Sequence, residues 1–430
     1  MHQPPDQLLS RIWRALLGVP PILIRVAALY WALVRYSLRV GGRHRAGIRR
    51  GFARRAALEA EHDAWISPLT ACSPSVYRVD AAFIARLASA APGAVPAPSA
   101  ALCAGCVVHF TGTGEMRHGP LASIELLLAH TPQLGALEHY IVDAPEHAAA
   151  YGGAMPFAEQ LWRELSPLLQ TQPGPCLFVG LSRGALAALE LGARAAAEQD
   201  KIVSVLAQSP PFVRPAQMPP AIELIASCEG LVTRSLAQLA LFPSPRLQRA
   251  YVQLSKPIQT LLTACVLAEL GLDDGPNQTL AMRDLVRDEP IASNLRSVRE
   301  FAMLTRVQQN ELSLFADKLG EVMAQDTRLS VAMAWGENDP WTPAAANLAL
   351  VEQAMARASS SRTSRGSRAD MLLRVLPGVG HAFCREPAHP VATLRAITAQ
   401  LIAWTEEKLR SRTGPTRWDD SGCRIPDCSR

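Results

Sequence analysis

The chain has 430 residues, of which 49% are apolar and 19% charged, a composition that excludes a disordered or fibrous protein and allows a large core. Its nine cysteines lack framework spacing, which argues against a disulfide scaffold and favours a reducing compartment. The net charge of +5 hides an asymmetry, because residues 1–55 carry eleven arginines and a single acid, Asp6.

Residues 1–60 form an apolar, Arg-rich leader. Within it, residues 15–34 are long enough to cross a membrane and are interrupted by one charge, Arg25. A central arginine is costly in a bilayer, and Pro20 and Pro21 break the helix nearby. A membrane span is therefore one of several readings, beside an organelle-targeting peptide and a helix packed on the protein body.

The helical periodicity of the leader favours an interfacial helix. At about 100° per residue, Arg25, Arg35 and Arg39 fall on one side, opposite an aliphatic and aromatic face. Such a helix lies flat on anionic lipid. We therefore predict that residues 11–55 contact an anionic membrane surface and that the protein is cytoplasmic and peripheral on the membrane.

Between the leader and residue 210, the sequence pattern predicts alternating strands and helices. Residues 61–104 read as a connecting segment with a Pro-rich linker. Short apolar runs predict strands over 106–110, 139–145, 175–182 and 201–210, and helices over 119–130, 156–170 and 183–199. Strands that alternate with helices indicate a parallel sheet.

This alternation stops at residue 211 and resumes near 326. Residues 211–325 contain only helical patterns and predict a helical cap inserted into one α/β domain, whose core is 105–210 and 326–410. The later elements are strands over 328–339 and 370–383 and helices over 344–357 and 390–409. Residues 411–430 read as a polar tail.

The stretch from Gly180 to Gly184 surrounds Ser182 with glycines two positions away on each side, between a predicted strand and a predicted helix. A serine at the tip of so sharp a turn needs neighbours without a β-carbon. The turn presents the Ser182 hydroxyl above the sheet, and it leaves the Arg183 N–H at the positive end of the helix, where it can stabilise an oxyanion.

An acid and a histidine follow two later strands. Asp339 comes just after the strand 328–339, and His381 lies in a Gly-flanked loop after the next strand. Ser182, Asp339 and His381 would then meet at the carboxyl edge of the sheet, with His381 as base and Asp339 holding the imidazolium. Asp143 and Glu337 are alternative acids.

With "GLSRG", "GENDPWTP" and "GVGHAF", the chain resembles the α/β-hydrolase superfamily over roughly residues 104 to 410. The resemblance implies the α/β-hydrolase fold, a mostly parallel sheet flanked by helices with a helical cap. It further implies that "HFTGTGE" is the oxyanion loop and that the Thr111 N–H is the second oxyanion donor.

Other chemistry-bearing residues have simpler interpretations. His109 is interpreted as a loop organiser, and the histidines His118, His130, His139 and His147 as surface residues. Cys103 and Cys106 are interpreted as small strand residues, since no second pair has zinc-like spacing. Cys423 and Cys428 lie in the tail. No phosphate-binding or dinucleotide motif occurs, and we predict no cofactor, no metal and no nucleic-acid partner.

A Ser-His-Asp site performs acyl transfer. The sequence therefore predicts a serine hydrolase for an ester or a thioester. Apolar runs at 236–242 and 261–270 favour an apolar acyl group. An acyltransferase with the same triad and a non-catalytic binding module are the alternatives.

Overall fold

The computed structural model describes most of the regular elements and the loops next to them. The described residues are 42–61, 67–90, 102, 104–112, 115, 117–143, 154–213, 309–325, 328–360, 370–381 and 390–413, with separate positions between 223 and 302. Contacts divide the chain into two compact units. One combines Met1–Ala64 with Met218–Arg306, and the other combines Trp65–Gln217 with Val307–Arg430.

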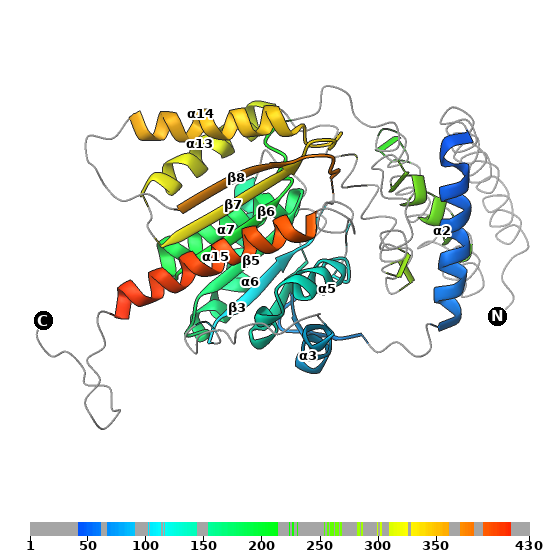
Figure 1. The fold of residues 1–430 in the computed structure, drawn as a ribbon, viewed down its shortest axis with the longest axis horizontal. Coiled ribbons are helices and arrows are strands. Elements are labelled where there is room, and N and C mark those ends of the chain that lie inside the picture. Colours follow the sequence, from blue (N-terminus) through cyan, green and yellow to red (C-terminus); the bar gives the residue numbers. More distant parts are fainter. Residues whose placement is uncertain are drawn as a thin grey trace, which may run out of the picture. The chain divides into compact units, whose positions relative to one another are not determined.

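An eight-stranded sheet forms the centre of the second unit (Figure 1). Its strands are β1 (Leu69–Ala71), β2 (Val76–Val79), β3 (Cys106–Phe110), β4 (Glu138–Val142), β5 (Cys176–Leu181), β6 (Val203–Gln208), β7 (Leu329–Gly336) and β8 (Asp370–Leu376). Their order across the sheet is β1-β2-β4-β3-β5-β6-β7-β8. β2 pairs antiparallel with both neighbours, and all pairs from β4 to β8 are parallel. The predicted mostly parallel α/β sheet is confirmed.

The central strands are buried on both faces. Every residue of β3, β6 and β7 is buried, which explains why these strands read in the sequence as mostly apolar runs without a polar face. In a parallel sheet the carboxyl ends of the strands lie at one edge. The chain therefore brings the ends of β3, β5, β6, β7 and β8 to the same edge.

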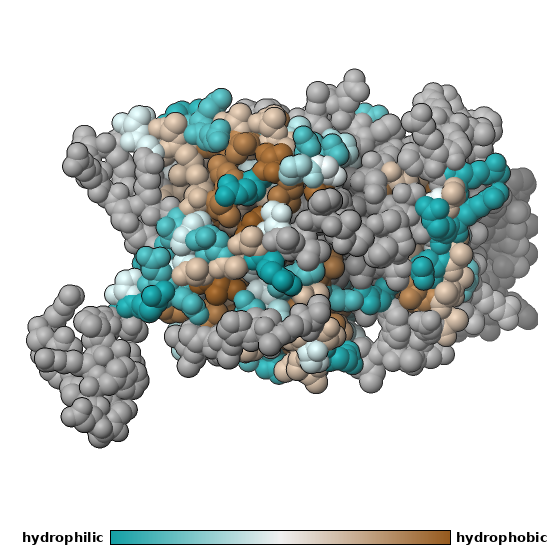
Figure 2. Space-filling model, viewed as in Figure 1, coloured by the Kyte–Doolittle hydropathy of each residue, from teal (hydrophilic) through white to brown (hydrophobic). Residues whose placement is uncertain are grey.

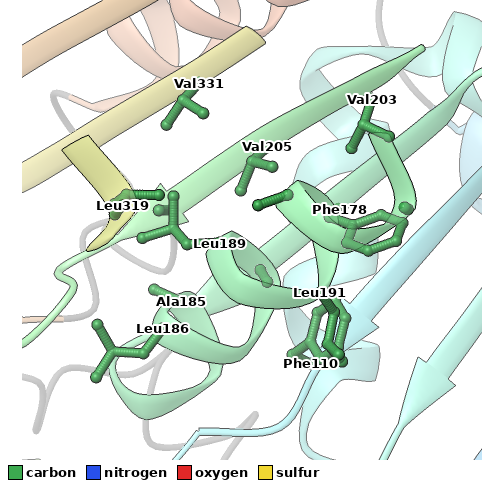
Figure 3. Packing of buried hydrophobic residues seen from close by; sticks show 14 of the residues in the cluster. Phe110, Phe178, Ala185, Leu186, Leu189, Leu191, Val203, Val205, Leu319 and Val331 are labelled. Carbon is green, nitrogen blue, oxygen red and sulfur yellow. The ribbon is translucent and has the colours of Figure 1, made fainter. Parts of the chain in front are cut away.

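Four helices pack on one face of the sheet: α6 (Ala154–Thr171), α7 (Arg183–Gln199), α13 (Gln309–Gln325) and α14 (Ala344–Ser360). In Figure 3, Phe178, Val205 and Val331 project from the strands towards Leu189 of α7 and Leu319 of α13. Burial of each such large apolar side chain contributes about 1.5–3 kcal/mol. This layer fixes α7, and hence the turn from β5 into α7.

Three helices contribute to the core on the opposite face: α3 (Ala81–Ser89), α5 (Pro120–His130) and α15 (Pro390–Thr413). Ile84, Ile124 and Leu401 of these helices share one buried cluster with Val107 and Leu206 of the sheet. The edge strand β8 is less covered, and Figure 2 shows apolar side chains between α14 and α15 over this strand. The sheet is thus enclosed by helices on both faces around its central strands.

Most predicted elements agree with the structure, but β1, β2, α3 and the short 3-10 helix η2 (Pro132–Ala136) were missed. The helix over 183–199 has the predicted bounds, whereas β8 ends at Leu376 instead of residue 383 because a turn follows at once. β1, β2 and α3 lie in the segment interpreted as a connection, where strands of three and four residues give almost no periodic signal. α13, at the end of the predicted cap segment, packs against α7 and α14.

In the first unit, α2 (Gly42–Glu61) packs through a narrow stripe. Its buried positions are Gly47, Gly51, Arg55 and Leu58, spaced by four, four and three residues as on one helix face. Arg55 donates to Gln259 Oε1 at 3.0 Å and to Thr260 Oγ1 at 2.9 Å. The helix that ends the leader is therefore joined by buried hydrogen bonds to the segment predicted as the cap.

The membrane-span reading of the leader concerns residues 15–34, which lie outside the described residues. Within the described part of the chain, no helix combines the length and apolar character that crossing a bilayer requires.

Candidate active site

Ser182 occupies a strained turn between β5 and α7. Its backbone has φ 56° and ψ −124°, a conformation that residues with a side chain rarely adopt. A β-carbon on Gly180 would lie 2.1 Å from Gly184 O, and one on Gly184 would lie 2.6 Å from Phe110 O. The two glycines are therefore required for the turn to close. Strain of this kind is typical of functional sites.

Arg183 is the first residue of α7, so its backbone N–H belongs to the positive end of that helix. Its side chain is buried, with an exposed fraction of 3%, and donates from Nη2 to Gly112 O at 3.2 Å. The residue after Ser182 thus also contacts the loop that follows β3.

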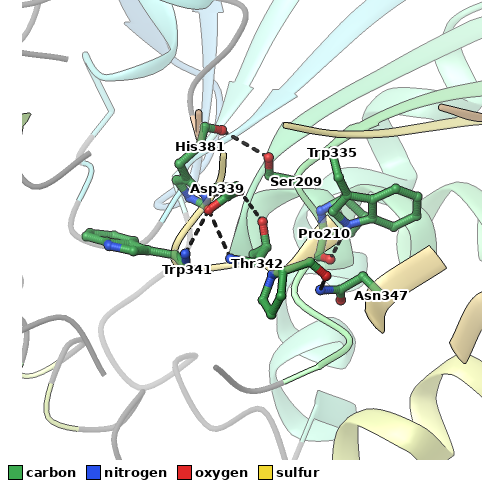
Figure 4. A network of polar contacts seen from close by, with 9 residues as sticks. Ser209, Pro210, Trp335, Asp339, Trp341, Thr342, Asn347 and His381 are labelled. Carbon is green, nitrogen blue, oxygen red and sulfur yellow. Dashed lines mark hydrogen bonds and ion pairs between the residues drawn. The ribbon is translucent and has the colours of Figure 1, made fainter. Parts of the chain in front are cut away.

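Asp339 and His381 form a buried pair (Figure 4). His381 Nδ1 lies 2.8 Å from Asp339 Oδ2. The other oxygen, Oδ1, accepts the Trp341 N–H at 2.8 Å and the Thr342 N–H at 2.9 Å, and the Thr342 hydroxyl donates to Oδ2. Burial alone would raise the pKa of Asp339, but His381 and Thr342 outweigh it and hold this pKa below its ordinary value.

The structure distinguishes Asp339 from the alternative acids. Glu337 Oε2 accepts the Gly378 N–H at 3.0 Å and so caps the turn after β8. Asp143 follows β4, which lies five strands from β8 in the sheet, whereas Asp339 follows β7, the neighbour of β8. Of these three acids, Asp339 is the one hydrogen-bonded to His381.

The end of β6 connects the serine turn to the histidine loop. The Ser182 N–H donates to Gln208 O at 2.8 Å, and the hydroxyl of the next residue, Ser209, donates to His381 O at 3.0 Å. Ser182 and His381 are therefore attached to adjacent residues at the same sheet edge. The structure thus brings Ser182, Asp339 and His381 to the same edge of the sheet.

The predicted oxyanion loop differs from the expectation. The Thr111 N–H donates to Val142 O at 3.2 Å, which continues the parallel ladder between β3 and β4 by one residue. The following N–H, that of Gly112, donates to Glu115 Oε2 at 2.6 Å. The N–H that the resemblance assigns to the oxyanion is thus already engaged in the sheet.

The interpretation of His118 and His139 as surface residues is wrong, since both are buried. His139 Nε2 lies 2.9 Å from Leu134 O, and its Nδ1 lies 3.1 Å from His109 Nε2. Burial lowers the pKa of His139 to about 4 and that of His109 well below its ordinary value. His109 and His139 therefore form a neutral pair that joins β3 to β4. His118 Nε2 lies 3.1 Å from Ser67 Oγ.

The cysteines show no metal site in the described part of the chain. Cys106 lies 3.7 Å, sulfur to sulfur, from Cys176 on the neighbouring strand. Cys103, Cys423 and Cys428 lie outside the described residues, as does His147. Among the residues that are described, no group of three or more potential ligands could hold a metal ion.

The sequence did not identify Thr342 and Ser209. Thr342 follows Asp339 by three residues, the spacing at which an aspartate side chain accepts hydrogen bonds from the turn it starts, so this signal was available. Ser209 gave no signal, because its contact with His381 joins residues 172 positions apart.

No model of a known protein family matches the chain, and no curated protein matches it. Solved structures that align with it include a monoacylglycerol lipase of Paleococcus ferrophilus, which is 17% identical, with 70% of this chain and 94% of that chain covered and a TM-score of 0.34. Another is a putative lipase of Acinetobacter baumannii, 12% identical over 82% and 97% of the chains, with a TM-score of 0.43.

A third such structure is the peroxisomal α/β-hydrolase Lpx1 of Saccharomyces cerevisiae. It is 12% identical, with 84% of this chain and 89% of that chain covered and a TM-score of 0.43. In the present chain, the sheet runs parallel from β4 to β8 and a strained serine turn joins β5 to α7. The chain therefore has the mostly parallel sheet and the serine turn of the α/β-hydrolase fold.

Proposed function

We propose that this protein is a serine hydrolase that cleaves an ester or a thioester. The hydrogen bond between His381 and the buried Asp339, at the sheet edge that carries the strained Ser182, is the observation that supports the proposal most. Lipases, an esterase and a thioesterase among the aligned structures agree with a reaction of this class.

In the proposed reaction, Ser182 Oγ attacks the carbonyl carbon of the substrate, and its proton passes to His381 Nε2. Asp339 accepts the Nδ1–H and stabilises the imidazolium. The tetrahedral intermediate then collapses, the bond to the leaving alcohol or thiol breaks, and the leaving group takes the proton from His381. Water repeats the sequence on the acyl-serine and releases the acid.

The Arg183 N–H, at the start of α7, is the proposed donor to the oxyanion. Thr111 can supply the second donor only if its bond to Val142 opens, because one N–H directed along the sheet cannot also point at the substrate. In the proposed reaction, the first oxyanion donor therefore lies at the start of α7, and a second donor becomes available only when the loop after β3 rearranges.

We further propose that the acyl group is apolar and that residues 211–325 act as its cap. In the described part of that segment, Leu261 is half-buried, and Leu267 is buried with an exposed fraction of 6%. Leu261→Ser should then lower kcat/KM for long-chain p-nitrophenyl esters more than for short-chain ones. An equal loss on both would mean that Leu261 only stabilises the fold.

A fluorophosphonate probe, which reacts with activated serines, tests the proposed function directly. We expect the wild-type protein to be labelled and Ser182→Ala not to be labelled, while Ser204→Ala, a buried serine on β6, is labelled like the wild type. Absence of label on the wild type would indicate a non-catalytic binding module. Labelling without hydrolysis of any ester, but with acyl transfer to an added alcohol, would indicate an acyltransferase.

We also propose that the leader attaches the protein peripherally to anionic membranes. On α2, the side chains of Arg45, Arg49, Arg50 and Arg54 are exposed, and Phe52 is 39% exposed beside them. Basic residues next to an exposed aromatic ring fit an anionic lipid surface.

Sedimentation of the full chain with phosphatidylserine vesicles tests this attachment. Combined Arg45→Ala, Arg49→Ala and Arg54→Ala substitutions should abolish sedimentation, and so should high salt. Arg163→Ala, at an exposed arginine of α6, is the control and should bind like the wild type. Binding that resists both the triple substitution and salt would contradict an electrostatic attachment.

A further inference from the structure

Ser209, the residue after β6, has a backbone conformation that its side chain makes unfavourable. Its φ is 47°, in the left-handed region that favours glycine, and the residue is completely buried. Apart from the serine of the β5–α7 turn, the only other described non-glycine residue with positive φ is the exposed Asp200. A serine kept in this conformation, inside the protein, indicates that its side chain has a task.

The backbone around Ser209 is held firmly in place. Its N–H donates to Ala334 O at 2.7 Å, and the carbonyl of the next residue, Pro210, accepts from Trp335 Nε1 at 2.9 Å (Figure 4). Both bonds reach β7, the strand that precedes Asp339. The position of the Ser209 hydroxyl is therefore fixed relative to the strand that carries the acid.

The hydroxyl of Ser209 donates to the backbone carbonyl of His381 at 3.0 Å. Beyond β7, the Asn338 N–H donates to Val379 O at 2.9 Å and ties the histidine loop to the acid loop. The histidine loop is thus attached at two points: Val379 is bonded to the acid loop after β7, and His381 is bonded to the residue after β6. The second attachment acts on the histidine itself.

We infer that Ser209 is a positioning residue for His381, an inference that rests on the proposed function. By holding the His381 carbonyl, its hydroxyl sets the imidazole between Asp339 and Ser182. The Ser182 N–H is bonded to the preceding residue, Gln208, so the end of β6 is the common reference for nucleophile and base. Misplacement of a catalytic group by about 1 Å can cost on the order of 100-fold in rate.

Two substitutions separate the hydroxyl from the strained backbone. Ser209→Ala removes the hydroxyl and keeps the strain, whereas Ser209→Gly removes both, because glycine tolerates φ 47°. Ser204→Ala is the matched control, since Ser204 lies on β6, the strand that Ser209 follows, is 2% exposed and bonds Thr405 Oγ1 of α15 at 2.6 Å.

Turnover of a short-chain p-nitrophenyl ester by the full chain is the first measurement. We expect Ser209→Ala and Ser209→Gly each to lower kcat about 10- to 100-fold with little change in KM, although Ser209→Gly should be the more stable of the two. Ser204→Ala should keep the kcat of the wild type. Wild-type kcat in Ser209→Gly, or an equal loss in Ser204→Ala, would overturn the inference.

The NMR resonance of the His381 Nδ1 proton is the second measurement, and it does not require catalysis. In ¹⁵N-histidine-labelled protein, this resonance should broaden through exchange with water in both Ser209 variants and stay sharp in Ser204→Ala. Ser182→Ala completes the panel: if it keeps wild-type turnover, the proposed function fails. An unchanged resonance in the Ser209 variants would refute the positioning role on its own.

Discussion

At the β7–β8 end of the candidate site, Asp339 receives hydrogen bonds from two backbone N–H groups, one hydroxyl and the His381 imidazole. At the β3 end, the N–H groups of Thr111 and Gly112 donate to Val142 O and to Glu115. We call the first region the acid–base half and the second the oxyanion half. In the proposed mechanism, the acid–base half is in place before a substrate binds, whereas the oxyanion half offers its β3 amides only after their present bonds open.

The largest effect is expected at the centre of the acid–base half. Asp339→Asn should lower kcat by about 10⁴-fold, because an amide in place of the carboxylate favours the wrong histidine tautomer. Ester hydrolysis is the assay. Glu337→Gln, whose side chain caps the Gly378 N–H, is the control and should change kcat by less than about tenfold. If Glu337→Gln lowered kcat more than Asp339→Asn does, Glu337 would be the acid that pairs with His381 in the reaction.

A smaller effect is expected for the hydroxyl that supports Asp339. Thr342→Val keeps the shape of the side chain and removes its bond to the carboxylate, so kcat should fall by about tenfold with KM unchanged. Thr398→Val is the control, because the Thr398 hydroxyl bonds Leu394 O within α15. If both variants behave alike, the bond from Thr342 does not orient the acid.

In the oxyanion half, Glu115→Gln should change kcat by less than about tenfold in either direction. The carboxylate of Glu115 holds the Gly112 N–H but takes no part in the proposed proton transfers, and glutamine keeps an acceptor oxygen there. The same ester assay applies. A loss as large as that of Asp339→Asn would remove the distinction between the two halves.

The histidine pair of β3 and β4 and the acid–base half should also lose stability in different pH ranges. Burial lowers the pKa of His139 from 6.5 to about 4 and lowers that of its partner His109, so the unfolded chain binds these protons more readily. Their contribution is complete above pH 6.5 and is lost as the pH falls towards 4. The pKa of Asp339 is lowered, so its contribution is complete above the ordinary value of 3.8 and is lost only below it.

Urea unfolding at a series of pH values measures this difference. The free energy of unfolding of the wild type should fall between pH 6.5 and 4, and His109→Gln with His139→Gln should flatten that part of the curve. A wild-type curve that is flat above pH 4 would contradict a neutral histidine pair.

The fold could be predicted because its strong signals are local. The mostly apolar runs of β3, β5, β6 and β7 fit strands covered on both faces, and the helix over 183–199 follows an Ala- and Leu-rich run. The hairpin of β1 and β2 escaped prediction because its strands are short and are ordered by pairing with β4. Pairing of that kind joins distant parts of the chain and leaves no periodic pattern.

In the site, the sequence predicted the groups that are recognisable from local motifs: a serine between two glycines, an acid before a turn and a histidine after a strand. The sequence did not predict those groups whose role depends on their hydrogen-bond partner in the folded chain. The Thr111 N–H extends the ladder to β4, and the Ser209 hydroxyl meets a histidine carbonyl far along the chain. Such contacts follow from strand register, which a single sequence does not reveal.

In the proposed mechanism, Ser182 and His381 act as one unit, because the end of β6 holds both of them. Hydrolysis of one ester by Ser182→Ala, His381→Ala and the double variant tests it most directly. We expect each single substitution to lower kcat by on the order of 10³-fold or more, and the double variant to be little worse than either, because the second residue has no task once the first is gone. Losses that multiply in the double variant would show that the two residues act independently and would contradict this account.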